Sequence, residues 1–147
     1  MIQKFNVSRD DSIYEAWPDV VLTDGGKLIC VFAECEHHKN RDNARIMITE
    51  SRDRGRSWSE KQPLTEKGKA GDYFNCARIS KLNDGSLAII CDKVCGNENQ
   101  KAENWLWLGD GEGENWSDPI RLPFCGIVPD KYRQLKSGRL IVSAHFK

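Results

Sequence analysis

The 147-residue sequence has no long hydrophobic run and no excess of charge of either sign. No apolar stretch approaches the roughly 20 residues that a membrane-spanning helix requires, so we expect no membrane partner. The 22 basic and 22 acidic residues cancel, and the basic clusters are short and interrupted by acids. Because a balanced charge provides no field that attracts nucleic acid, we expect no nucleic-acid partner either.

Familiar cofactor and nucleophile motifs are also missing. The sequence contains no Gly-x-Gly-x-x-Gly or Walker pattern to cradle phosphates, and no Gly-x-Ser-x-Gly elbow. The acidic segment that starts at Asp110 is not an EF-hand, since its sixth position is Asn115 where that loop requires glycine. We therefore expect no cofactor.

The chain begins without an apolar leader or a small-residue cleavage site, which favours a cytoplasmic location. In that compartment cysteines are expected as reduced thiols rather than disulfides. This prediction covers all six: Cys30, Cys35, Cys76, Cys91, Cys95 and Cys125. Three of them, Cys30, Cys76 and Cys91, lie within apolar runs, where cysteine acts as a small hydrophobe.

A plan of strand, tight turn and strand occurs three times, over residues 18–34, 77–93 and 130–146. Aligned on the leucine before each turn, the repeats lie 60 and 53 residues apart, close to the roughly 40–50 residues of four-stranded blade repeats. Glycine provides the positive φ that a tight hairpin needs. The predicted turns are Asp24-Gly25, Asp84-Gly85 and Ser137-Gly138, and the aligned leucines are Leu22, Leu82 and Leu135.

The second strands of the hairpins, residues 28–32, 87–91 and 140–144, are nearly continuous apolar runs, typical of strands covered on both faces. Third and fourth strands are expected near 44–50 and 61–64 in the first repeat, and near 104–108 and 120–123 in the second. The sequence thus predicts an all-β domain of two and a half four-stranded units, over about 15–66, 72–124 and 126–147.

The turn between the predicted third and fourth strands has its own spacing, with Ser51, Asp53, Gly55 and Trp58. A serine hydroxyl and an aspartate carboxylate accept backbone N–H groups inside such a turn, glycine permits the left-handed kink, and tryptophan folds beneath as an apolar plug. In the second repeat Gly113 and Trp116 keep this spacing, while Asp110 lies one position off. We interpret both turns as structural.

This Ser-x-Asp-x-Gly-x-x-Trp pattern resembles the Asp-box, or BNR repeat, of the sialidase (neuraminidase) superfamily. Residues 51–58 match it in full, and the hairpins resemble the inner two strands of sialidase blades. The resemblance implies an N-terminal fragment of a six-bladed β-propeller, with about two and a half blades in this chain. Because an open propeller leaves a sheet face exposed, we expect self-association.

The resemblance also implies an exo-acting glycoside hydrolase for a terminal, possibly acidic sugar, with its site on the rim where the inner strands begin. Asp42 lies in the loop that carries the family's acid/base, a residue that would protonate the leaving oxygen. The alternative, a solvated Asp42 or one paired with Arg41 or Arg45, is equally open. The arginine of the family's Arg-Ile-Pro motif is absent, since residues 16–18 read Ala-Trp-Pro. The family's tyrosine nucleophile belongs to later blades, so we expect no turnover by these 147 residues alone.

Residues at equivalent strand ends would converge on a carbohydrate ligand. Trp17 would stack on a sugar ring, and basic side chains would bind carboxylates or hydroxyls. For each of these residues the alternative role is an ion pair at a strand end. The adjacent histidines His37 and His38 lack a recognised zinc-ligand spacing, so we expect no metal. The candidate substrate-binding set is Trp17, Asp19, Glu34, His37, His38, Arg41, Arg78, Lys93, Asp130, Lys131 and His145.

A second function stays open. The Asp-box indicates fold better than activity, so the chain is alternatively a non-catalytic carbohydrate-binding or assembly module. Tyr73 and Tyr132 do not match the family's nucleophile position, and we assign neither a catalytic role.

Overall fold

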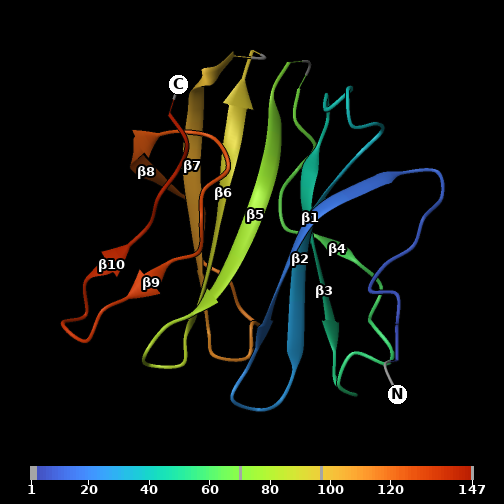
Figure 1. The fold of residues 1–147 in the computed structure, drawn as a ribbon, viewed down its shortest axis with the longest axis vertical. Helices are drawn as coiled ribbons and strands as arrows, with labels where there is room; N and C mark the ends of the chain where they lie inside the picture. Colours follow the sequence, from blue (N-terminus) through green and yellow to red (C-terminus); the bar gives the residue numbers. More distant parts are fainter. Residues whose placement is uncertain (1–2, 70, 97, 147) are drawn as a thin grey trace.

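The computed structural model describes residues 3–69, 71–96 and 98–146, and among these residues it contains strands, turns and loops but no helix. The all-β prediction is confirmed. Two four-stranded antiparallel sheets follow each other along the chain, and a two-stranded hairpin follows them (Figure 1). In the described part of the chain, no helix is long and apolar enough to cross a membrane.

In each sheet the strands pair in the order in which they occur in the sequence. The first sheet contains β1 (Tyr14–Leu22), β2 (Leu28–Cys35), β3 (Arg45–Ser51) and β4 (Gln62–Pro63). The second sheet contains β5 (Tyr73–Lys81), β6 (Leu87–Cys95), β7 (Glu98–Gly109) and β8 (Ile120–Cys125). The hairpin consists of β9 (Arg133–Gln134) and β10 (Leu140–Ile141).

The main core lies between the two sheets, and the period-2 alternation of β2 and β6 explains it. From β2, Ile29 and Val31 pack against Leu87 and Ile89 of β6. The intervening side chains point to the opposite faces, where Ile90 and its neighbours contact the third hairpin. Side chains on both faces of β2 and β6 are therefore buried, as their continuous apolar runs predict.

The third hairpin differs from the prediction. Tyr132 and Val142 pack on the second sheet, but the strand expected over residues 140–144 is only Leu140–Ile141, whose side chains are 40% and 48% exposed. Among the described residues, β10 pairs with β9 alone.

The hairpin turns correct the alignment on leucines. In the first turn Gly26, not Gly25, has a positive φ, of 85°, and the corresponding angles are 85° at Gly85 and 83° at Gly138. The N–H of Gly26 donates to Thr23 O, as the N–H of Gly85 donates to Leu82 O. Thr23, rather than Leu22, is therefore the structural equivalent of Leu82, and the extra glycine of the first turn caused the one-residue error.

The turn over residues 51–58 is called the first Asp-box turn after the pattern that it resembles, and it is closed by its own side chains. The Ser51 hydroxyl accepts the N–H of Gly55 at 2.9 Å and donates to Asp53 Oδ1. Asp53 accepts the Ser57 N–H at 2.9 Å, and the Trp58 indole N–H donates to Gly55 O. Backbone hydrogen bonds from Ser57 are the main reason that the pKa of Asp53 falls to about 2.

The second turn uses Asp110 in the same way despite its offset. Its carboxylate accepts the N–H groups of Glu112, Glu114 and Asn115 at 2.9–3.1 Å. The Trp116 indole donates to Gly113 O, as Trp58 does to Gly55 O. Both Asp-box turns lie at the lower end of the sheets in Figure 1, with the β1–β2 and β5–β6 turns. The upper end, where β1 and β5 begin and β2 and β6 end, is called the rim below.

Candidate functional site

Each of the three repeats enters the rim through a non-glycine residue with positive φ. The angles are 53° at Trp17, 46° at Cys76 and 52° at Val128. In β1 this residue lies in a bulge that shifts the register between Ala16 and Asp19, and β5 has a bulge at the corresponding place. Bulges redirect side chains, and backbone strain of this kind concentrates at functional sites. The rim is therefore the place to search for chemistry.

An aromatic cluster surrounds Trp17 at the rim. The ring centroids of Tyr14 and His38 lie 6.2 Å and 6.1 Å from that of Trp17, and 5.3 Å from each other. The Arg41 guanidinium lies 4.9 Å above the Trp17 ring, a cation–π arrangement. The structure thus brings together three residues of the predicted binding set: Trp17, His38 and Arg41.

Arg41 is held by stacking and by a backbone contact rather than by an acid. Its Nε–H donates to His38 O at 3.2 Å. Within the described parts of the chain, no carboxylate forms an ion pair with it. Its charge also acts on the buried Tyr73: burial raises the pKa of that hydroxyl, and Arg41 opposes the shift. The rim therefore presents a half-buried arginine beside aromatic rings, and no described carboxylate lies within ion-pair distance of it.

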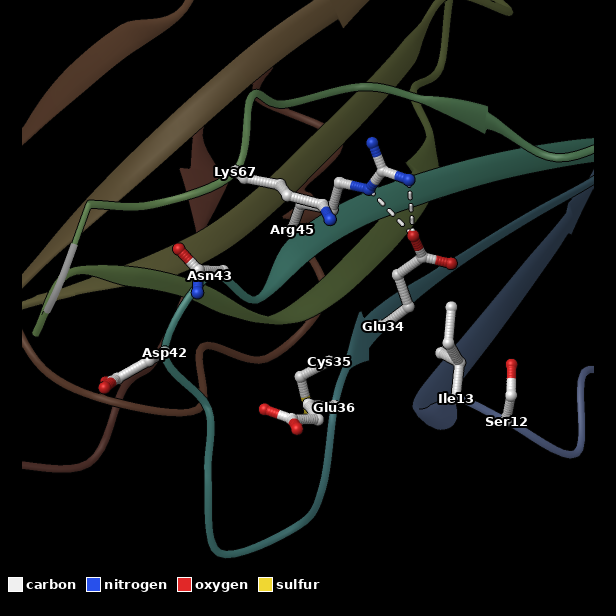
Figure 2. A pocket seen from close by; sticks show the side chains of 9 residues that line it. All are labelled: Ser12, Ile13, Glu34, Cys35, Glu36, Asp42, Asn43, Arg45 and Lys67. Carbon is white, nitrogen blue, oxygen red and sulfur yellow. Dashed lines mark hydrogen bonds and ion pairs between the residues drawn. The ribbon is translucent and has the colours of Figure 1, made fainter.

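Asp42 lies next to this cluster, on a cavity of about 280 Å³ between the end of β2 and the start of β3. The lining residues include Glu34, Asp42, Asn43 and Arg45 (Figure 2). In Figure 2 the Asp42 carboxylate points away from the Glu34–Arg45 pair. The described residues give Asp42 no ion pair with Arg41 or Arg45, because these arginines have other partners.

Glu34 has a structural role. It is 4% exposed, and its carboxylate pairs with Arg45 at 2.7 Å and with Lys61 at 2.8 Å. Burial alone would raise the pKa of Glu34, but the hydrogen bonds from Lys61 and Arg45 outweigh it and hold the pKa below its ordinary value. Lys61 also pairs with Glu15 of β1 at 2.6 Å, so this cluster joins β1, β2 and β3 to the residue that precedes β4.

Asp19 and Lys131, both in the predicted binding set, pair with each other at 2.8 Å. Asp19 Oδ2 also accepts the N–H of Ile79 at 3.0 Å. One carboxylate thus joins β1, β5 and the segment that leads into β9, which is the ion-pair alternative expected for residues at strand ends.

The other predicted binding residues have neighbours of their own. Lys93 lies 3.9 Å from Asp72 and 5.6 Å above the Phe74 ring. Arg78 donates to Ala77 O, and the exposed His37 accepts the N–H of Lys39. Asp130 and His145 are exposed and hold the third repeat through backbone hydrogen bonds, to Ser143 and Ile127 respectively.

The sequence prediction did not include two parts of this end of the molecule. Tyr14 completes the aromatic cluster, and its position three residues before Trp17 at the start of β1 was the available signal. The second part is a buried polar row, Asn75, Asp92 and Asn104, which pairs across β5, β6 and β7. Only strand register brings these three residues together, so no local motif marks them.

No protein-family model matches the sequence. The structure is similar to the crystal structure of a protein of unknown function from Dyadobacter fermentans DSM 18053, with a TM-score of 0.72 and 18% sequence identity. The match covers 95% of this chain and 49% of that one, so the chain spans about half the length of its structural neighbour. At this identity the similarity concerns the fold alone.

Proposed function

We propose that the chain forms two and a half blades of a sialidase-type six-bladed β-propeller whose rim binds a terminal, acidic sugar as part of a glycoside hydrolase. Three features support the blades: sheets that pair their strands in sequence order, face-to-face packing of successive sheets, and Asp-box turns at the end opposite the rim.

The observation that carries the proposal is Arg41, which is stacked on Trp17 and forms no ion pair with a described carboxylate. A guanidinium presents a planar fork that matches a carboxylate, and stacking on Trp17 fixes that fork in place. The Arg-Ile-Pro arginine of the family would leave β1 beside Trp17, where this chain has Ala16. Arg41 reaches the same neighbourhood from the loop after β2 and supplies the missing charge.

Asp42 is the proposed general acid. It is half-buried on its cavity and immediately follows Arg41 in the chain. If Arg41 holds the carboxylate of a sugar, the glycosidic oxygen of that sugar would lie close to Asp42, which belongs to the same loop. Such proximity is required for proton transfer to a leaving group. The nucleophile would come from outside these residues, so we expect binding without turnover.

The test is binding of glucuronic acid, with glucose as its uncharged analogue, monitored by NMR shifts of the tryptophan indole N–H groups. We expect binding of glucuronic acid alone, with the largest shift at Trp17. Arg41→Gln should weaken it at least tenfold, because a charge-assisted bidentate pair contributes about 1.5–3 kcal/mol. Arg56→Gln, in an exposed turn at the opposite end, is the matched control.

Equal binding of the two sugars, or equal losses in the two arginine variants, would contradict the role of Arg41. Measurable hydrolysis of an aryl glucuronide by this chain would contradict the missing nucleophile.

A second candidate function, a non-catalytic assembly module, is favoured by exposed apolar side chains at both ends of the sheet array. Val20 and Leu22 of β1 are 47% and 54% exposed, and Phe146 is 75% exposed. Self-association through these faces would support that role, and its test is given in the Discussion.

A further inference from the structure

The buried polar row lies directly below the rim, on the face of the second sheet that meets the third repeat. Asn75, Asp92 and Asn104 are cross-strand partners on β5, β6 and β7 and are 3%, 0% and 0% exposed. In the first sheet the equivalent positions are the apolar Ala16, Ala33 and Ile46. The polar row is therefore not a requirement of this sheet architecture.

The row holds the backbone of the third repeat. Asp92 Oδ1 accepts the N–H of Val128 at 3.3 Å, and the Asn104 amide donates to Gly126 O at 3.0 Å. Val128 is the strained residue with which the third repeat enters the rim. Asp92 and Asn104 thus fix the segment that carries Asp130 and Lys131.

Each of the three side chains has an oxygen left over. Asn75 Oδ1, Asp92 Oδ2 and Asn104 Oδ1 are buried and have no hydrogen-bond donor. A buried acceptor without a donor is destabilising, and native proteins supply a partner for nearly all of them. A proton on the Asp92 carboxylate supplies one donor to this row and requires no additional volume.

We propose that Asp92 is a proton-binding site whose protonation is coupled to the charge of Arg41, so that an anion held by Arg41 is bound more tightly at acid pH. The coupling to an anion rests on the function proposed above, whereas the proton site stands on the buried row alone. A proton taken up from solvent at Oδ2 turns this oxygen into a donor towards a neighbouring amide oxygen and removes the buried charge.

The charges around Asp92 agree with this role. Burial raises its pKa to about 6, and the Val128 N–H, Arg41 and Asn75 oppose the shift. The other titratable groups acting at this place are the hydroxyl of Tyr73 and the thiols of Cys76 and Cys91, all of which burial keeps protonated. Arg41 is therefore a cation whose charge offsets that of Asp92.

An anion bound to Arg41 would neutralise part of the positive charge that stabilises the ionised Asp92. The Asp92 charge would then be harder to maintain, so binding of the anion and uptake of a proton favour each other by linkage. Because the pKa of Asp92 in the folded chain exceeds the ordinary 3.8, its contribution to stability is complete below pH 3.8 and disappears as the pH rises through about 6.

The first experiment measures the unfolding equilibrium constant against pH for wild type, Asp92→Asn and Arg41→Gln. Relative to Asp92→Asn, wild type should become easier to unfold by about tenfold per pH unit between pH 3.8 and about 6, the slope of one proton. In Arg41→Gln the upper limit of this pH range should lie at a higher pH, because the cation that stabilises ionised Asp92 is removed. In the double variant the window should be absent.

Asp118→Asn, an exposed aspartate at the other end of the second sheet, is the control and should keep the wild-type slope. The same slope in wild type and Asp92→Asn would overturn the proton site, and an unmoved window in Arg41→Gln would overturn the coupling. Carboxyl ¹³C NMR of wild type decides the first point without a variant. An aspartate that titrates near pH 6 supports the site, and none between about pH 5 and 7 refutes it.

Binding of glucuronic acid then tests the coupling between the proton site and an anion. Wild type should bind it about fivefold or more tightly at pH 5 than at pH 7, whereas Asp92→Asn should show a smaller difference. Equal pH dependence in both overturns the linkage to the anion. Absence of binding at either pH refutes the proposed function and with it the linkage to the anion, while the unfolding and NMR results still decide the proton site.

Discussion

Single residues explain why the second Asp-box turn departs from the pattern of the first. Where the first turn has Ser51, the second has Gly109, and a Cβ there would lie 2.7 Å from the Trp116 ring. The indole therefore occupies the space that a serine would need. Asp110 replaces the lost hydroxyl by accepting three backbone N–H groups, so the two sequences reach similar turns by different hydrogen bonds.

Substitutions at two glycines distinguish the cost of backbone strain from the cost of a packing clash. Gly138 has a φ of 83° and no atom within 4 Å of the place where an alanine methyl group would lie. Gly113 has a φ of 65°, and Ile29 Cδ1 lies only 2.6 Å from the corresponding place. We expect Gly138→Ala to lower the free energy of unfolding by about 1 kcal/mol through strain. Gly113→Ala should lower it by about 2–4 kcal/mol, because the buried Ile29 side chain must also shift.

Urea unfolding of the two glycine variants provides the measurement. Equal losses would mean that the contact with Ile29 relaxes freely, and that packing at this place adds nothing to strain.

Among the secondary-structure elements, the β1–β2 turn is held to the second Asp-box turn by charged side chains. Lys27 is 2% exposed and pairs with Glu50 at 2.6 Å and Glu114 at 2.8 Å. Glu112 accepts the Thr23 hydroxyl and the Gly25 N–H. The two sheets are thus joined by polar contacts at the turn end and by apolar packing between their faces.

Burial would lower the pKa of Lys27, but Glu114 and Glu50 outweigh it and hold the pKa above 10.5, so the pairs persist until the pH rises through that higher value. We expect Lys27→Met to lower the free energy of unfolding by about 1–3 kcal/mol at neutral pH, less than a fully buried pair because both glutamates are partly hydrated. The measurement is again urea unfolding.

Lys81→Met is the control for Lys27→Met, since Lys81 pairs with the exposed Asp24 at 2.6 Å. It should change stability by less than about 1 kcal/mol. A loss as large as that of Lys27→Met would show that burial does not distinguish the two pairs.

For the whole molecule, the faces that no strand covers decide solution behaviour. On the outer face of the first sheet, Cys30, Phe32 and Met47 are buried beneath Val7 and Trp58 rather than beneath another strand. Val20 pairs in register with Cys30 and extends this face to the edge of β1, where its side chain is 47% exposed. An apolar sheet face of this kind favours association.

We expect the weight-average mass from light scattering to rise with protein concentration. Val20→Glu should reduce that rise because it places a charge on the uncovered face. Ile120→Glu, a comparably exposed position on the edge strand β8, is the control. A monomer at every concentration would contradict the prediction and would remove the support for an assembly module.

Much of the fold was predictable because local chemistry determines it. Continuous apolar runs indicated β2 and β6, and the spacing of Ser51, Asp53, Gly55 and Trp58 indicated a closed turn. The one-residue error at the first hairpin arose where two glycines adjoin, since sequence alone does not say which of them takes the positive φ.

The sequence by itself thus determined the strands, the turns and their repetition, because hydrophobic period and turn chemistry act between residues near each other in the chain. Only the tertiary structure decided which charged residues remain available for a ligand. Asp19 and Lys131, far apart in the chain, neutralise each other, while Arg41 is left stacked on Trp17. The row around Asp92 depends on the register of three strands, which no local pattern fixes.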